Sequence, residues 1–161
     1  MPDVTTHIAG LRELAAALRE LPARVGGNVL RGAVAGGAQV VRKEAVTRAP
    51  EYHGDVTKGH PPPGTLKRAI YMKWMRSESD PARQVWIVGV RSGKKWQSVG
   101  KKQRNLDAYY WSFVEFGTSK SAAHQFMRPA LASTQDQAIK VIQERLMQRI
   151  DEAAAKLAYH P

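Results

Sequence analysis

The chain has 161 residues, of which 43% are hydrophobic and 24% charged, a balance that is ordinary for a globular protein and excludes wholesale disorder. Its formal net charge is +11, and it contains no cysteine, which excludes disulfides, thiolate metal sites and cysteine nucleophiles. The length predicts one domain, residues 1–161. With no apolar run of about 20 residues and no signal-peptide pattern at the start, we expect a soluble protein made in the cytoplasm.

Positive charge is concentrated in the middle of the chain. Residues 51–105 contain 12 Lys or Arg and 4 Asp or Glu. Residues 1–50 contain 7 basic and 4 acidic residues, and residues 106–161 contain 6 of each. Such an excess indicates an acidic partner, and nucleic acid is the first candidate because neutralised phosphates release counterions. An acidic protein neighbour would serve equally well.

Two helices are predicted in the first third of the chain. The first covers about residues 7–21 and ends at Pro22, with one apolar stripe formed by Ile8, Leu11, Leu14, Leu18 and Leu21. The second covers about residues 25–48 and stops at Ala49-Pro50, with Leu30, Val34, Val41 and Ala45 on one side. Each of its interior glycines costs about 1 kcal/mol relative to alanine, so we expect another backbone to approach closely there.

The middle of the chain predicts a hairpin between two long loops. Residues 50–66 form the first loop, which contains Pro61-Pro62-Pro63. The first strand is predicted over about 67–75, where Ile70, Met72 and Trp74 alternate with Tyr71 and Lys73. The second is predicted over about 84–91, where Val85 and Ile87 alternate with Trp86, Val88 and Val90, and the linker between the strands contains Pro81. Residues 92–105 form the second loop, which holds Trp96 and no acid; its basic residues are Lys94, Lys95, Lys101, Lys102 and Arg104.

The last third of the chain predicts one long helix. It covers about residues 130–157, with an apolar face formed by Leu131, Ile139, Ile142, Leu146, Ile150 and Leu157. The aromatic segment 109–116 is either a strand or a short helix, since periodicity does not separate the two in so short a run. The expected fold is therefore α+β, an antiparallel β-sheet packed by long N-terminal and C-terminal α-helices, with long basic loops.

No motif in the sequence supports an enzyme. The common phosphate-loop, dinucleotide and zinc-protease patterns are missing. His53, Asp55 and His60 could in principle hold a metal, but no further ligand at helical spacing supports such a site. A solvated loop is therefore the preferred interpretation. Ser112, Glu115 and His124 lie in no nucleophile-elbow context, and Ser112 and Glu115 are better explained as part of an aromatic packing segment. We expect no catalytic residues, no cofactor and no metal.

The basic loop has two interpretations. Lys94, Lys95, Lys101, Lys102 and Arg104 could bind phosphates while Trp96 stacks on a base, or the loop could be a solvated segment whose charge keeps the protein soluble. No helix-turn-helix, homeodomain or zinc-finger pattern is visible, so specific base readout is not expected.

Two strings carry a family resemblance. Tyr109-Tyr110-Trp111-Ser112-Phe113-Val114-Glu115-Phe116-Gly117-Thr118 is followed by Gln125-Phe126-Met127-Arg128-Pro129-Ala130-Leu131. With Gly10-Leu11-Arg12-Glu13-Leu14 and Ala49-Pro50 upstream, this order resembles the head-tail joining family, the neck or tail-completion proteins of siphophages. Two departures stand out: Gln125 replaces the usual proline, and residues 51–66 lengthen a turn that is normally short.

The resemblance implies a non-enzymatic structural protein of the virion. It would be a subunit of a ring, six-fold, between the head connector and the tail tube or tail-terminator proteins, with the genome passing through the lumen. The motif residues Glu115, Phe116, Gly117, Thr118, Phe126, Arg128, Pro129 and Ala130 would shape one tight corner of the fold. Within it we expect a positive φ at Gly117, a turn bonded by Thr118, Pro129 in the first turn of the last helix, and pairing of Glu115 with Arg128.

Two other classes of function remain open. A free nucleic-acid-binding protein is supported by the charge but by no motif. A small hydrolase would rest only on scattered residues such as Ser112 and His124.

Overall fold

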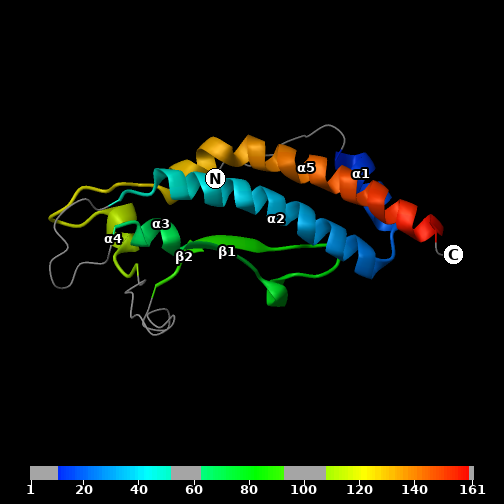
Figure 1. Cartoon of the computed structure of the whole chain (residues 1–161), viewed down its shortest axis with the longest axis horizontal. Helices are drawn as coiled ribbons and strands as arrows, with labels where there is room; N and C mark the ends of the chain where they lie inside the picture. The colour runs from blue at the N-terminus through cyan, green and yellow to red at the C-terminus, as the bar shows by residue number, and fades with distance from the viewer. Residues whose placement is uncertain (1–10, 52–62, 93–107, 160–161) are drawn as a thin grey trace.

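The computed structural model describes residues 11–51, 63–92 and 108–159. Within them the protein is α+β, as expected: long helices α2 and α5 pack along each other, and a two-stranded antiparallel sheet lies against α2. In Figure 1 the molecule is elongated, with α1 and α5 on one side, α2 in the middle and the hairpin on the other side. Helix α4 and the short α3 lie together at one end.

Helix α2 spans Ala23–Arg48 and helix α5 spans Met127–Tyr159, close to the predicted ranges 25–48 and 130–157. Pro22 precedes α2, and Ala49 is already extended because Pro50 follows it. At 33 residues, α5 is about 50 Å long and runs the length of the molecule. These two helices form the largest packing interface of the fold.

The face that α2 buries includes Ala45 of the expected apolar side but otherwise differs from it. Leu30, Val34 and Val41 are only half-buried, whereas Val29, Ala33, Gly36 and Gly37 are buried. A Cβ atom on Gly37 would lie 2.6 Å from Ile142 Cδ1 and 3.0 Å from the carbonyl oxygen of Ala138. The glycines therefore permit the close approach of α5 that their cost in the helix predicted.

Helix α5 likewise buries its small residues at the close contact. Ala130, Thr134, Ala138, Leu146 and Ile150 are buried, but the expected core residues Leu131 and Leu157 are 56% and 41% exposed. Close packing of two helices favours small side chains at the point of contact, which turns the larger ones outward. The buried stripe of α5 was therefore wrongly placed at its two ends.

Helix α1 spans Leu11–Glu20, within the predicted range 7–21, of which residues 7–10 lie outside the described residues. Leu14, Leu18 and Leu21 pack against a cluster formed by Val29 and Ala33 of α2 and the C-terminal half of α5. The predicted apolar stripe of this helix is confirmed over its described part.

The hairpin is confirmed, with a correction at its start. Strand β1 spans Ile70–Trp74 and pairs antiparallel with β2, Trp86–Val90, with Ile70 opposite Val90 and Trp74 opposite Trp86. Residues 67–69, expected to begin the first strand, instead belong to helix α3, Thr65–Ala69, which also takes up the end of the predicted loop 50–66. A helical turn buries Thr65, Leu66 and Ala69 together, which an extended chain could not do because its side chains alternate.

The aromatic segment is a short helix, α4, which spans Trp111–Phe116. A short 3-10 turn, Arg76–Glu78, follows β1. Among the described helices, none is both long enough and apolar enough to cross a membrane.

Candidate functional site

The motif residues meet at the corner between α4 and α5. Glu115 and Phe116 end α4, Gly117 and Thr118 form the turn after it, and Phe126 directly precedes α5. Arg128, Pro129 and Ala130 lie in the first turn of α5. We call this arrangement the α4–α5 corner.

Glu115 connects the two helices of the corner. Its side chain is almost fully buried, at 2% exposure, and accepts three backbone hydrogen bonds. The N–H groups of Phe126 and Met127 donate to Oε2 at 2.8 and 3.0 Å, and that of Arg128 donates to Oε1 at 3.2 Å. The first N–H groups of a helix have no partner within it, and the positive end of the helix dipole favours a carboxylate there. Glu115 thus caps α5 from 12 residues before the helix begins.

The expected pairing of Glu115 with Arg128 needs correction. Glu115 binds the backbone N–H of Arg128, while the guanidinium of Arg128 lies over the ring of Phe116, 5.1 Å from its centre. The carboxylate faces the helix end because the N–H groups there need an acceptor and that of Phe126 is buried, whereas Arg128 is exposed.

The turn of the corner has the geometry expected from its residues. Gly117 has φ +76° and ψ 179°, a conformation that other residues adopt only with strain. The hydroxyl oxygen of Thr118 accepts the N–H groups of Lys120 and Ser121 at 3.2 and 3.1 Å. The N–H of His124 then donates to the carbonyl of Val114 at 2.8 Å, so the chain returns alongside α4.

Phe126 anchors the corner in the protein core. It is fully buried and belongs to a cluster with Ala45 and Ala49 of the α2 end and with Leu66 and Ile70 of the α3–β1 segment. Pro129 is the third residue of α5, where its missing N–H costs no intrahelical bond. Residues of the motif thus connect α4 and α5 to the core formed with α2, α3 and β1.

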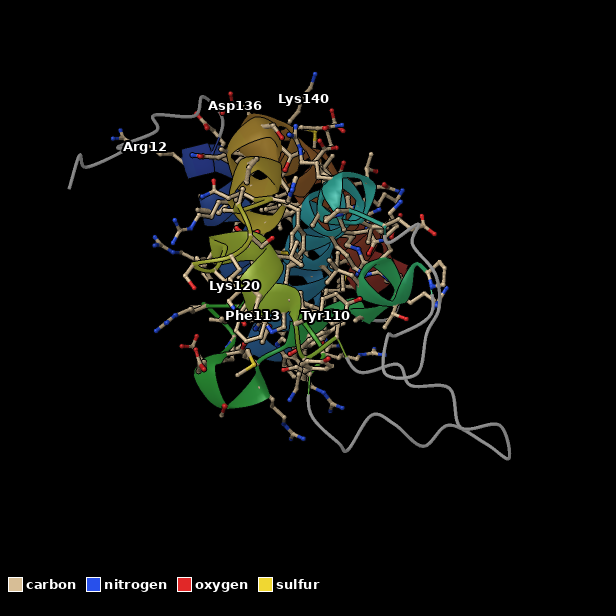
Figure 2. All side chains as sticks on the ribbon, turned by 90° about the vertical axis from the view of Figure 1, so that its left-hand side faces the viewer. Arg12, Tyr110, Phe113, Lys120, Asp136 and Lys140 are labelled. Atoms are coloured by element: carbon tan, nitrogen blue, oxygen red, sulfur yellow. The ribbon has the colours of Figure 1, made fainter. Side chains whose placement is uncertain are left out.

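The outer side of the corner is aromatic and exposed. Tyr109, Phe113 and Phe116 are 54%, 55% and 56% exposed. Phe113 and Phe116, three residues apart, lie on one face of α4 away from the buried Glu115, and Tyr109 lies two residues before the helix begins. Figure 2, which looks at this end of the molecule, shows Phe113, Tyr110 and Lys120 around α4. The residue types alone predict a packing segment, and helical spacing is the signal that separates the outward rings from the inward carboxylate.

A cleft of about 300 Å³ adjoins the aromatic face. Its walls include Pro50, Leu66, Tyr110, Phe113 and His124. Burial raises the pKa of the Tyr110 hydroxyl above its ordinary value, against a smaller opposing effect of a hydrogen bond to the backbone of Leu66. This cleft contains mainly apolar groups and suits an apolar side chain of a partner.

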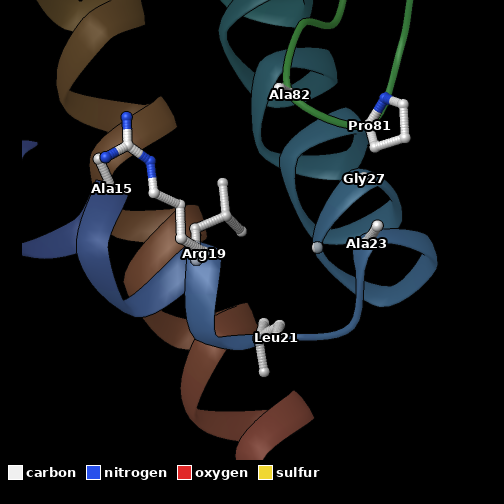
Figure 3. A pocket seen from close by; sticks show the side chains of 9 residues that line it. Ala15, Arg19, Leu21, Ala23, Gly27, Pro81 and Ala82 are labelled. Atoms are coloured by element: carbon white, nitrogen blue, oxygen red, sulfur yellow. The ribbon is translucent and has the colours of Figure 1, made fainter.

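A second cleft, of about 410 Å³, lies at the opposite end of the molecule. Figure 3 shows it between α1, the start of α2 and the hairpin turn, with Arg19, Gly27 and Pro81 among its lining residues. A Cβ on Gly27 would lie 3.1 Å from Cα of Pro81, so the hairpin turn touches the helix directly. No sequence motif pointed to this cleft.

Several predicted residues lie outside the described residues. These are Lys94, Lys95, Trp96, Lys101, Lys102 and Arg104 of the basic loop, and His53, Asp55 and His60 of the earlier loop. In the hydrolase interpretation Glu115 would orient His124. Both of its carboxylate oxygens instead accept hydrogen bonds from N–H groups at the start of α5.

Comparison with known proteins finds one family. The chain matches, over residues 12–117, the HK97-gp10-like family, described as a proposed tail component of the bacteriophage HK97 gp10 type. The match extends from α1 to the glycine of the α4–α5 corner. Neither the curated proteins nor the solved structures give a match. Since the matched region covers well over half of the sequence, the chain belongs to the HK97-gp10-like family of bacteriophage tail components.

Proposed function

We propose that this phage tail-component protein is a single-domain subunit of the head-tail junction. In this proposal copies of the chain form a six-fold ring between the head connector and the tail tube or tail-terminator proteins, and the genome passes through the lumen. Family membership supports a structural role in the virion. The exposed aromatic face of the α4–α5 corner supports assembly through protein contacts.

The aromatic face carries the proposal. Tyr109, Phe113 and Phe116 are each more than half exposed, and the Glu115 cap fixes the short helix that bears two of them. Clustered exposed aromatic side chains mark interaction sites, and such residues are enriched in interface cores. A rigid support lowers the entropic cost of binding. The face therefore suits a neighbouring subunit or an adjoining ring.

The proposal includes no catalytic role and no cofactor. The one buried carboxylate of the motif is fully engaged with the backbone of α5. In the described parts of the chain, no three His, Asp or Glu side chains gather as a metal site would require. The motif residues are then structural, and we propose that they hold the corner in shape for assembly.

Electron microscopy of a phage lysate in which this gene alone is disrupted tests the proposal. Filled heads and finished tails lying apart would support a joining role. Normally joined particles would contradict it and would favour the alternative, a free nucleic-acid-binding protein, for which the net charge of +11 is the supporting observation.

Complementation of the disrupted gene tests the aromatic face. The double substitution Phe113→Ser and Phe116→Ser should leave heads and tails unjoined while the purified protein still melts cooperatively. Met147→Ser is the matched control, because Met147 is also 56% exposed but lies on α5. Equal joining by both variants would remove the aromatic face from the proposal.

The basic loop is proposed to face either the DNA channel or an acidic patch of an adjoining ring. Its residues Lys94, Lys95, Trp96, Lys101, Lys102 and Arg104 form a stretch without any acid. Charge reversal of the four lysines should abolish joining. An unchanged phage yield would contradict this role of the loop.

A further inference from the structure

Charge is divided unequally between the layers of the fold. Helix α1 carries two basic and two acidic residues, and α5 carries five and four. Helix α2 carries five basic residues and one acidic residue, and residues 63–92, which include the hairpin, carry six and two. The positive excess of the described residues therefore lies on the α2 and hairpin side, and the α1–α5 side is nearly balanced.

Some of these cations are used inside the protein. Arg42 donates from Nε to the carbonyl of Ile70 at 3.2 Å, and the guanidinium of Arg31 lies 4.8 Å from the centre of the Trp74 ring. Lys67 pairs with Glu51 at 3.1 Å. These three side chains hold the hairpin segment to its neighbours and are poorly placed to bind a partner.

Four other cations follow the hairpin and point to solvent. Lys73, Arg76 and Arg83 are exposed and form no ion pair with the residues that the structure describes. Arg91 is also exposed, and its guanidinium lies over the Tyr71 ring, 5.4 Å from its centre. We call Lys73, Arg76, Arg83 and Arg91 the hairpin cations.

The strand register shows which way this face points. Ile70 is buried and Trp74 contacts Arg31 of α2, so the alternate residues Tyr71 and Lys73 face away from the helix. Opposite them lie Gly89 and Ile87. Among the paired positions this face carries Lys73, uncharged residues and no acid, while Arg76, Arg83 and Arg91 lie beyond the strand ends, as do the acidic residues Glu78 and Asp80.

The hairpin cations extend over a length suited to duplex DNA. At one end of the hairpin the backbone N–H of Arg91 donates to the carbonyl of Ala69, and Arg76 and Arg83 lie near the other end. The chain from Ala69 to Met75 makes six residue steps between these levels, which is roughly 20 Å of strand. A duplex presents one phosphate charge per about 1.7 Å of its axis, so a row of this length meets several phosphates.

We propose that the outward face of the hairpin binds the phosphate backbone of duplex DNA without reading its sequence. Phosphate contacts position a protein on DNA but carry no sequence information, which fits exposed cations in a sequence that shows no base-reading motif. The choice of DNA as the ligand rests on the proposed function, because a neck subunit meets the genome. In the ring, the hairpin then faces the lumen and α5 faces outward.

Fluorescence anisotropy of the purified full-length chain with a labelled, short mixed-sequence duplex tests the face. Lys73→Glu with Arg91→Glu should weaken binding at least tenfold and reduce the slope of log affinity against log salt by about 2, measured between about 50 and 200 mM salt. Lys73→Glu with Arg76→Glu should behave in the same way and leaves the contact of Arg91 with Tyr71 intact.

Lys140→Glu with Lys156→Glu is the matched control. Both lysines are exposed on α5, and the change in net charge is identical. The control should keep affinity within about twofold and lose little of the salt slope. Equal losses in hairpin and control variants would overturn the proposal, since net charge alone would then explain binding.

The outcome separates the DNA-binding face from the joining role. A wild-type chain that binds no duplex at low salt overturns the DNA proposal. If hairpin variants nevertheless fail to join heads to tails, the partner of the hairpin cations would be an acidic protein surface. Duplex binding that depends on the hairpin cations, in a phage that joins normally without the gene, supports the DNA-binding face and contradicts the joining function.

Discussion

Removal of the Glu115 carboxylate should strongly destabilise the α4–α5 corner. Glu115→Ala leaves the N–H groups of Phe126, Met127 and Arg128 without their acceptor. Phe126 is fully buried, so water cannot readily replace the carboxylate there. An orphaned buried donor costs about 1–3 kcal/mol, and the loss of a helix cap costs about 1 kcal/mol. Together they predict a loss of about 3 kcal/mol in the free energy of unfolding.

The amide variant separates charge from hydrogen bonding. In Glu115→Gln, one oxygen can still accept the two N–H groups that bind Oε2, but the amide nitrogen then meets the N–H of Arg128, donor against donor. The helix also loses a negative charge at its positive end. We expect a loss of about 1–2 kcal/mol.

Urea denaturation at neutral pH measures both variants. A lower midpoint with an unchanged slope would show a change in stability alone. For a chain of this size, about 3 kcal/mol corresponds to a melting temperature lowered by about 6–12 °C. Glu144→Ala, at an exposed site of α5, should stay within about 0.5 kcal/mol of the wild type.

Arg128→Ala provides the decisive comparison. Its guanidinium only covers the Phe116 ring, so its removal should cost about 0.5–1 kcal/mol. A loss equal to that of Glu115→Ala would indicate a Glu115–Arg128 ion pair instead of a backbone cap. A Glu115→Ala protein as stable as Glu144→Ala would refute the cap itself.

Four further substitutions test the packing, the Gly117 turn and the buried Tyr110. Gly37→Ala should lower the free energy of unfolding by roughly 1–3 kcal/mol in urea denaturation, because its Cβ would lie 3.0 Å from the carbonyl oxygen of Ala138. Gly32→Ala should be neutral or slightly stabilising, because its Cβ meets only the flexible end of Arg149. Equal losses in the two variants would contradict this account. Gly117→Ala should lower the melting temperature, at a strain cost of about 1–3 kcal/mol, and an unchanged melt would exclude that strain. Burial raises the pKa of Tyr110, so this hydroxyl ionises first in the unfolded chain and the free energy of unfolding falls as pH rises above about 10. Tyr110→Phe should reduce that fall. Parallel curves of stability against pH for the variant and the wild type would contradict this prediction.

Local sequence determined the parts of this fold that depend on neighbours in the chain. Prolines at 22 and 50 set the limits of α2, and the long amphipathic pattern after Ala130 predicted α5. Alternating residues and the linker with Pro81 predicted the hairpin. The family resemblance agrees with the match over residues 12–117, which includes the first string as far as Gly117 and ends before the second. Each of these signals repeats over many residues or acts on the adjacent backbone, so it can be read without the fold.

Tertiary structure decided the features that depend on distant partners. Which side of α2 is buried follows from the close approach of α5 at Gly37, which local hydrophobicity does not record. Residues 67–69 are helical because one turn there buries Leu66 and Ala69 together against the core. Glu115 caps a helix that begins 12 residues later, and no local pattern distinguishes that contact from pairing with Arg128. Burial in a close-packed interior leaves a polar group only the partners that packing brings to it, and packing is a property of the whole chain.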